Sequence, residues 1–231
     1  MNNRRVTFFK AIIHVFAWSA LGWLIWDYYN GNLTANPLQA ATQRTGKYAL
    51  IMLVSSLACT PLNTLFGWKI ALKFRRMLGL YAFMFATIHM LIFVGLDYGF
   101  NWYFLWQDLS SKRYIWVGLL TLIILTLLAA TSFQWWMRRL GKNWKRLHRL
   151  VYLAGGLVVL HYAWSNKGDV LALQGDVIQP FAFGLAVALL LLVRIPVIRQ
   201  KTAAFRNYLR LKFNWTASPG TGRTDSQGQI P

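Results

Sequence analysis

Six apolar stretches, each about as long as a bilayer is thick, constrain this sequence more than any motif does. A helix needs about 20 residues to cross the hydrocarbon core of a membrane. The apolar residues of this chain come in continuous blocks of that length, and only 13% of all residues are charged. We therefore predict an all-α membrane protein, a bundle of six transmembrane helices at about 8–27, 48–68, 77–97, 114–136, 147–165 and 177–198.

The charge distribution indicates which way the predicted bundle faces. A net charge of +19 would suggest nucleic-acid binding in a soluble protein. Here, however, the basic residues cluster in every second segment between the predicted spans, which puts most of them on one side of the bundle. If the N-terminus is cytoplasmic, 20 of the 25 Lys and Arg residues fall on the cytoplasmic side, and every acidic residue except Asp225 falls on the opposite side. This is the positive-inside pattern. We expect both termini in the cytoplasm, contact with membrane lipid and no nucleic-acid partner.

The segments between and after the spans have distinct compositions. Residues 30–46 are polar and rich in turn formers, which predicts an outer loop. The aromatic stretch 100–107 is too short to cross and is predicted to lie in the outer interface, where a docking surface for another protein is the alternative. Residues 204–213 resemble a basic amphipathic helix. We therefore expect one transmembrane domain over 1–213 and a disordered cytoplasmic tail over 214–231.

Two histidines fall at equal depth in different predicted spans. At about 1.5 Å per residue, His89 lies some 18 Å into the third span and His161 about 21 Å into the fifth, measured from the cytoplasmic side. An imidazole at membrane depth needs a partner, and a haem iron clamped between two imidazoles supplies one. We expect His89 and His161 to bind one haem nearer the outer face. His14 has no depth partner and is predicted to be a packing residue.

His148 lies roughly 20 Å before His161 along the helix, which suggests a second redox centre toward the cytoplasm. The matching position on the third span is Arg76, so a second bis-histidine haem cannot be built from these helices. A spacing of 13 residues also turns the side chain by roughly 220°. A kink at Gly155 and Gly156 would be needed if one straight helix carried both histidines. A lipid-headgroup role for His148 stays open.

Three arginines at the predicted inner face are candidate partners for acidic groups of a cofactor. Their guanidinium groups could pair with haem propionates or with a flavin phosphate. Ordinary topology anchoring is the alternative for each of them. They are Arg75, Arg76 and Arg149.

Three motifs in this chain are similar to those of one known family. The stretches RRMLGLYAFMFATIHM at 75–90, RRLGKNWKRLHRLVYL at 138–153 and HYAWS at 161–165 resemble the MsrQ (YedZ) family. These are haem-binding membrane subunits of the bacterial protein-methionine-sulfoxide reductase system, within the ferric-reductase-like superfamily. The resemblance implies haem b held by His89, His148 and His161, electrons from the quinone pool, and flavin mononucleotide as a further candidate cofactor. It also implies a periplasmic molybdopterin-containing reductase as partner.

From these observations we predict a cytochrome b of the bacterial inner membrane that relays electrons to a periplasmic reductase. Sulfoxide reduction itself is expected on the partner, because this sequence shows no recognisable molybdenum site. One haem is expected, and the nature of the inner centre is left open. Two alternatives stay open as well: a stand-alone transmembrane ferric or quinone reductase, and a histidine-dependent proton channel or transporter.

Overall fold

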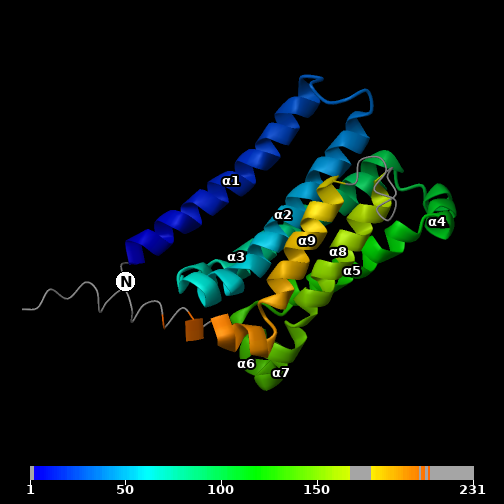
Figure 1. The fold of residues 1–231 in the computed structure, drawn as a ribbon. Helices are drawn as coiled ribbons and strands as arrows, with labels where there is room; N and C mark the ends of the chain where they lie inside the picture. The colour runs from blue at the N-terminus through cyan, green and yellow to red at the C-terminus, as the bar shows by residue number, and fades with distance from the viewer. Residues whose placement is uncertain (1–2, 167–177, 203, 206–207, 209–231) are drawn as a thin grey trace, which may run out of the picture.

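The computed structural model describes residues 3–166, 178–202, 204, 205 and 208, and within them every regular element is helical. Figure 1 shows long helices running side by side with short ones at their ends. In chain order the elements are α1 (Asn3–Tyr29), α2 (Pro37–Phe66), η1 (Ala71–Lys73), α3 (Arg75–Leu91), η2 (Ile92–Asp97), α4 (Trp102–Ser111), α5 (Arg113–Ala130), α6 (Gln134–Leu140), α7 (Lys142–Leu147), α8 (Leu150–Ser165) and α9 (Ile178–Leu192).

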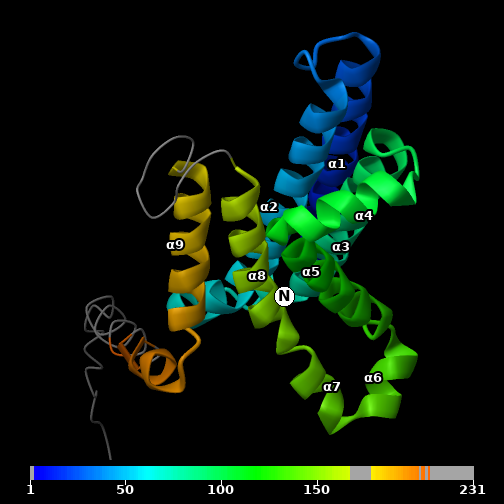
Figure 2. The same ribbon diagram turned by 90° about the vertical axis from the view of Figure 1, so that its right-hand side faces the viewer.

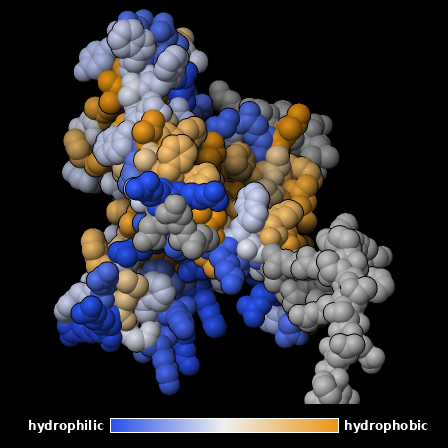
Figure 3. Space-filling view, turned by 90° about the vertical axis from the view of Figure 1, so that its left-hand side faces the viewer, coloured by the Kyte–Doolittle hydropathy of each residue, from blue (hydrophilic) through white to orange (hydrophobic). Residues whose placement is uncertain are grey.

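Successive long helices run in opposite directions, so the chain alternates between two ends of the bundle. We call basic end the one where α1 and α3 begin and where α6 and α7 lie (Figure 1). The acidic residues that the structure describes, Asp27, Asp97 and Asp108, lie at or beyond the other ends of these helices. A space-filling view shows hydrophobic side chains over the middle of one face and hydrophilic ones along its lower edge (Figure 3). This arrangement fits the charge pattern read from the sequence.

The second helix begins 11 residues before the predicted span, so the prediction of a loop over all of 30–46 was wrong. Asn36 caps this helix, because its side chain accepts a hydrogen bond from the backbone N–H of Gln39, and Pro37 occupies the first turn. Gly46 therefore lies inside α2 rather than in a turn. The early start brings 37–47 alongside the half of α3 that lies away from the basic end, where His89 contacts Thr42.

The helix after 113 ends six residues before the predicted limit of 136. Thr131 and Ser132 turn their hydroxyl groups back to the carbonyls of Leu127 and Leu128, and Phe133 is extended. The indole N–H of Trp144 donates to the Thr131 carbonyl at 2.9 Å, which ties α7 to the end of α5. Polar groups that satisfy the last carbonyls stop the helix here despite its apolar sequence.

Two further boundaries differ from the predicted spans of 147–165 and 177–198. His148 and Arg149 form a turn, and α8 starts only at Leu150, so His148 and His161 are not on one helix. The last long helix ends at Leu192, and the segment Pro196–Thr202 follows at a bend of 79°. The residue before a proline avoids the helical conformation, which accounts for the break.

The number of membrane crossings therefore stays a prediction. Four described helices are long and apolar enough to cross, namely α1, α2, α3 with η2, and α5, and the bent pair after 178 could be a fifth. The 16 residues of α8 reach about 24 Å, short of a core of about 30 Å. The described residues leave out the two ends of the chain. Most of the predicted helix 204–213 and all of the predicted tail 214–231 therefore lie outside them.

Two helix pairs form the centre of the bundle. α2 packs along α3, and α5 packs along α8, as the two ribbon views show together (Figures 1 and 2). The core between the pairs contains Leu53 and Phe85 from the first and Leu125 and Ala154 from the second. By contrast, α4 covers little, and its aromatic side chains Trp102, Tyr103, Phe104 and Trp106 are all more than half exposed. That exposure fits the interfacial position predicted for 100–107.

Candidate haem-binding site

His89 of α3 and His161 of α8 face each other across the two helix pairs. Their ring centroids are 6.1 Å apart and their planes are perpendicular. Two bonds of about 2 Å from imidazole nitrogens to one metal, plus half the width of each ring, also come to roughly 6 Å. The two histidines predicted to lie at equal depth are therefore brought together at a distance that suits one shared iron.

Each of these rings is oriented by a backbone carbonyl on the neighbouring helix. The Nδ1–H of His89 donates to the Thr42 carbonyl of α2 at 2.8 Å, and the Nδ1–H of His161 donates to the Tyr114 carbonyl of α5 at 2.8 Å. Because a carbonyl can only accept, the proton sits on Nδ1 and the lone pair on Nε2. This is the tautomer and the outer hydrogen bond that metal-binding histidines use.

A glycine on the neighbouring helix makes room for each ring. A Cβ atom at Gly46 would lie 3.0 Å from His89 Nδ1, and one at Gly118 would lie 2.7 Å from His161 Cε1. Contacts this short force something to move. Glycine at both positions therefore lets the imidazoles lie directly against the backbone of α2 and α5.

The two histidine environments are copies of one arrangement. Donor and acceptor are 47 residues apart in both hydrogen bonds, and each glycine follows the accepting residue by one helical turn. The buried positions of the two helices repeat with an offset of 72 residues: Ala49, Met52, Leu53, Ser56 and Leu57 of α2 correspond to Thr121, Ile124, Leu125, Leu128 and Ala129 of α5. The α2–α3 and α5–α8 pairs thus build two equivalent halves of one site.

The donor set fits haem better than it fits a free metal ion. Among the described residues, no group of three or more His, Cys, Asp or Glu side chains could hold a metal ion. Two neutral imidazoles alone leave most positions of a transition metal unfilled, whereas a haem macrocycle supplies its own four nitrogens. His89 and His161 are the residues that would hold such a group, one on each face.

His148 lies apart from this pair, in the turn between α7 and α8 at the basic end. Its ring packs on Trp144, with centroids 4.1 Å apart, and its Nδ1 bonds to the Trp144 carbonyl at 3.2 Å. Its Nε2 is enclosed and lacks a well-formed hydrogen bond to any described residue, while the Leu128 carbonyl lies close enough to act on the imidazole. Because the turn frees His148 from the direction of α8, the 220° difficulty of a single straight helix does not arise.

The three predicted arginines lie at the same end, and two of them act on the His148 imidazole. Arg75 and Arg76 open α3 and are close enough to act on His148 electrostatically. Arg149 follows His148 directly and is exposed. The position equivalent to His148 in the first helix pair, 72 residues earlier, is Arg76. A second bis-histidine site is thus absent from the described residues.

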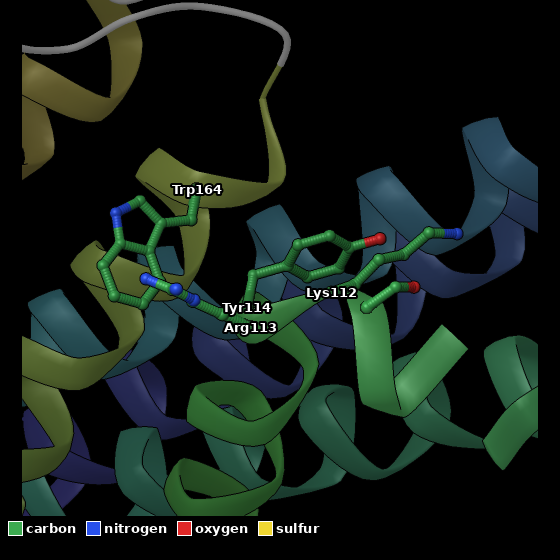
Figure 4. Close-up of a pocket in the computed structure, with 5 residues that line it drawn as sticks. Lys112, Arg113, Tyr114 and Trp164 are labelled. Atoms are coloured by element: carbon green, nitrogen blue, oxygen red, sulfur yellow. The ribbon is translucent and has the colours of Figure 1, made fainter. Parts of the chain in front are cut away.

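Beyond the His89–His161 pair, an open pocket of about 490 Å³ lies toward the end of the bundle opposite the basic end. It is lined by Ser111, Lys112, Arg113, Tyr114 and Trp164. Tyr114 connects the pocket to the histidine pair, because its carbonyl accepts from His161 and its ring lies 5.9 Å from the His161 ring. Figure 4 shows the Arg113 side chain beside the Trp164 indole, while the Tyr114 ring points toward Lys112.

A polar network fixes the segment before this pocket. The Tyr98 hydroxyl and the Lys112 ammonium group both donate to the Asp108 carboxylate. These bonds, that of Lys112 first, hold the pKa of Asp108 below its ordinary value, and the Asp108 carboxylate in turn raises the pKa of Lys112. The network ties α4 to the residues on either side of it.

Sequence reasoning missed the groups that orient the histidines. The acceptors Thr42 and Tyr114 contribute backbone atoms, which carry no sequence signature. The glycines did leave one: Gly46 and Gly118 precede His89 and His161 by the same number of residues. As for the fourth histidine, His14 of α1 is hydrogen-bonded to the Tyr81 hydroxyl of α3, a helix-to-helix contact of the packing kind predicted for it.

Comparison with known proteins agrees with this architecture. The family described as "ferric reductase like transmembrane component" matches residues 44–159, a range that includes Gly46, His89, Gly118 and His148 and ends two residues before His161. Among curated proteins, the "protein-methionine-sulfoxide reductase heme-binding subunit MsrQ" of Rhodospirillum rubrum is 42% identical over 183 residues, which cover 77% of this chain and 85% of that protein.

Proteins of the same name from two other organisms align over similar lengths. The one from Xanthomonas euvesicatoria is 41% identical, with 70% of this chain and 77% of the relative covered. The one from Bordetella pertussis is 38% identical, with 78% and 85% covered. At this identity and coverage the resemblance read from the sequence motifs is confirmed. The chain belongs to the MsrQ family of ferric-reductase-like membrane proteins.

Proposed function

We propose that this chain is a haem b membrane subunit that passes electrons from the quinone pool of the bacterial inner membrane to a periplasmic molybdopterin-containing protein-methionine-sulfoxide reductase. The observation that carries the proposal is the His89–His161 pair, with both Nδ1–H groups on backbone carbonyls and both Nε2 atoms left as bases. Relatives of the same family that align over most of this chain are named as heme-binding subunits of that reductase system.

A bound haem would supply reversible one-electron chemistry, and the chain would supply position and potential. The Thr42 and Tyr114 carbonyls keep His89 and His161 in the ligating tautomer and make both imidazoles more basic. A more basic ligand favours ferric over ferrous iron, so these bonds lower the reduction potential. Apolar packing around Phe85, which is fully buried, keeps water from the pair.

At the basic end, we propose that His148 holds an inner redox centre, a haem with one protein ligand or a flavin mononucleotide. Its enclosed Nε2, which lacks a well-formed hydrogen bond to any described residue, supports this role. Arg75 and Arg76 stand near enough to balance the acidic groups of such a cofactor, with Arg149 at the adjacent surface. Electrons would then move from the basic end toward the His89–His161 pair, with both termini on the cytoplasmic side.

On the outer side, we propose that the pocket around Arg113 and Trp164 is where electrons leave for the partner. Tyr114 and Trp164 bring aromatic rings from the surface to within one helical turn of His161. The exposed aromatic side chains of α4 lie beside this exit and offer the partner a contact surface. Sulfoxide reduction takes place on the partner in this proposal.

Visible spectra of the chain purified in mild detergent, oxidised and dithionite-reduced, test the proposal together with the haem-to-protein ratio. His89→Ala and His161→Ala should each abolish the low-spin b-type spectrum, because one imidazole alone cannot complete the site. His148→Ala should keep the spectrum of the outer haem. His14→Ala is the control, since it removes a histidine that also lies inside a long apolar helix but bonds to the Tyr81 hydroxyl of α3 instead.

The same series separates the alternatives. A folded wild-type chain that contains no haem after expression with added haem would refute electron transfer and leave the proton channel or transporter. Haem in the chain together with ferric or quinone reduction that needs no periplasmic protein would instead support the stand-alone reductase. Retention of the full spectrum in both His89→Ala and His161→Ala would refute the assignment of the ligands.

A further inference from the structure

Arg194, which the sequence marks only as one of many basic residues, reaches back into the helix bundle. It follows the end of α9, and its Nη2 donates to the Leu57 carbonyl of α2 at 2.5 Å. Its guanidinium group also lies 4.7 Å from the centroid of the Tyr152 ring of α8. Three helices therefore meet at this one side chain.

The sequence explains why the Leu57 carbonyl is available. In a regular helix it would accept from the backbone N–H four residues later, but that residue is Pro61, which has no N–H. The Leu57 carbonyl therefore lacks its helical hydrogen bond, and the Arg194 side chain donates one in its place. Pro61 thus fixes where the Arg194 side chain points.

That contact uses only part of the guanidinium group. The Tyr152 side chain also forms a hydrogen bond with the group, but the Nε of Arg194 is enclosed and has no hydrogen-bond partner among the described residues. A buried donor without a partner is costly, and more so when it carries charge. One more acceptor is needed on the Nε side of the group.

A second positive charge stands nearby. Arg75 opens α3, where its own carbonyl accepts from the Ser56 hydroxyl at 2.8 Å, so it lies beside Leu57, the residue that Arg194 contacts. Its charge also acts on both Arg194 and His148. The described acids lie at the opposite end of the bundle. The two guanidinium groups repel each other across a partly apolar site, so an anion bound between them would stabilise both charges.

We propose that Arg194 and Arg75 together bind an oxyanion, a carboxylate or a phosphate, on a molecule held between α3, α8 and α9 at the basic end. A guanidinium group presents two parallel N–H donors, and its free Nε completes such a pair for an oxygen acid. The source is either an acidic group of the inner cofactor, which rests on the proposed function, or the headgroup of a bound phospholipid.

The test compares Arg194→Gln with Arg199→Gln in the full chain purified in detergent. Arg199 is the matched control, because it is an exposed arginine on the same end of the molecule. Haem, flavin and bound phospholipid are each quantified per chain, the last by native mass spectrometry. Loss of charge-assisted hydrogen bonds should weaken retention of the bound anion by roughly ten- to a hundredfold. Arg194→Lys should restore part of it.

The pattern of loss identifies the source. Less haem, or a lower midpoint potential in a redox titration, indicates a haem carboxylate; less flavin with unchanged haem indicates a flavin phosphate; less phospholipid with both cofactors unchanged indicates a headgroup. If all three contents and the midpoint potentials equal those of Arg199→Gln, the anion site is refuted.

Two further measurements keep the result interpretable. Arg75→Gln should reproduce the loss if Arg194→Gln does not fold, as judged by size-exclusion chromatography. The haem content of the wild type reports separately on the proposed function. A haem-loaded wild type with unaffected Arg194 and Arg75 variants would overturn this inference alone, whereas a haem-free wild type that loses phospholipid on Arg194→Gln would overturn the proposed function alone.

Discussion

Replacement of Gly118 by alanine tests the proposed ligand geometry with a single added methyl group. The new Cβ would lie 2.7 Å from His161 Cε1 and 2.8 Å from Nδ1, while ordinary contacts begin at 3.4 Å. The ring therefore has to move by about 0.7 Å away from α5. That movement strains the hydrogen bond to the Tyr114 carbonyl and misdirects Nε2 from the position it shares with His89.

The size of the effect follows from what the hydrogen bond does for a ligand. Loss of such an outer-shell partner costs roughly ten- to a hundredfold in metal affinity. Gly46→Ala should have the same sign but a smaller effect, because its Cβ would lie 3.0 Å from His89 and asks for a shift of only about 0.4 Å. Gly156→Ala is the control, since nothing lies within 4 Å of the added methyl group.

These differences are measured by the rate at which each variant loses its haem to an excess of a haem-free acceptor protein, followed by absorbance. The expected order of loss rates is Gly118→Ala fastest, then Gly46→Ala, then Gly156→Ala equal to wild type. In Gly156→Ala the stability of α8 should increase by up to about 1 kcal/mol, because alanine is a better helix former than glycine. Wild-type haem retention in Gly118→Ala, or equal losses in all three variants, would refute the role given to the glycines.

Two further predictions concern the end of the bundle opposite the basic end. Asp27 is buried and pairs with Arg44 at 2.5 Å, so Asp27→Asn should lower the free energy of unfolding by about 1 kcal/mol, as followed by thermal unfolding in detergent. Lys112 and Tyr98 hold the pKa of Asp108 below its ordinary value, so the stabilisation is present at neutral pH and is lost as pH falls below about 4. Tryptophan fluorescence of α4 should report that loss, and Asp108→Asn should remove the acid dependence; an unchanged acid profile would contradict it.

How far the sequence predicts this fold depends on whether a boundary is set by hydropathy or by local chemistry. Apolar blocks correctly located the centres of the long helices. They misplaced the start of α2, because the polar residues after Pro37 hide a helix that its Asn36 cap in fact announces. They also extended α5 past Thr131, whose hydroxyl ends the helix without lowering the hydropathy of the segment.

The site was predictable in depth but not in orientation. Counting residues along straight helices is enough to bring His89 and His161 to one level, since the rise per residue is constant. It fails for His148, because the predicted span from 147 placed His148 on the same helix as His161, whereas a turn at His148 and Arg149 separates α7 from α8. The contact between Arg194 and Leu57 joins residues 137 positions apart, and only the packing of α9 on α2 reveals it.

In the proposed orientation, the charges of the protein and the membrane potential act on the electron in opposite directions. Positive charges such as Arg75 and Arg194 stabilise a reduced centre at the basic end. At the His89–His161 pair, the two carbonyl hydrogen bonds favour the oxidised iron. Both effects hold the electron inside, whereas an inside-negative potential favours outward movement by about 2.3 kcal/mol per 100 mV for a full crossing. Outward transfer through this chain should therefore accelerate when the membrane is energised, and removal of the Arg194 charge should accelerate it further at any given potential, because the electron at the basic end is then less stabilised.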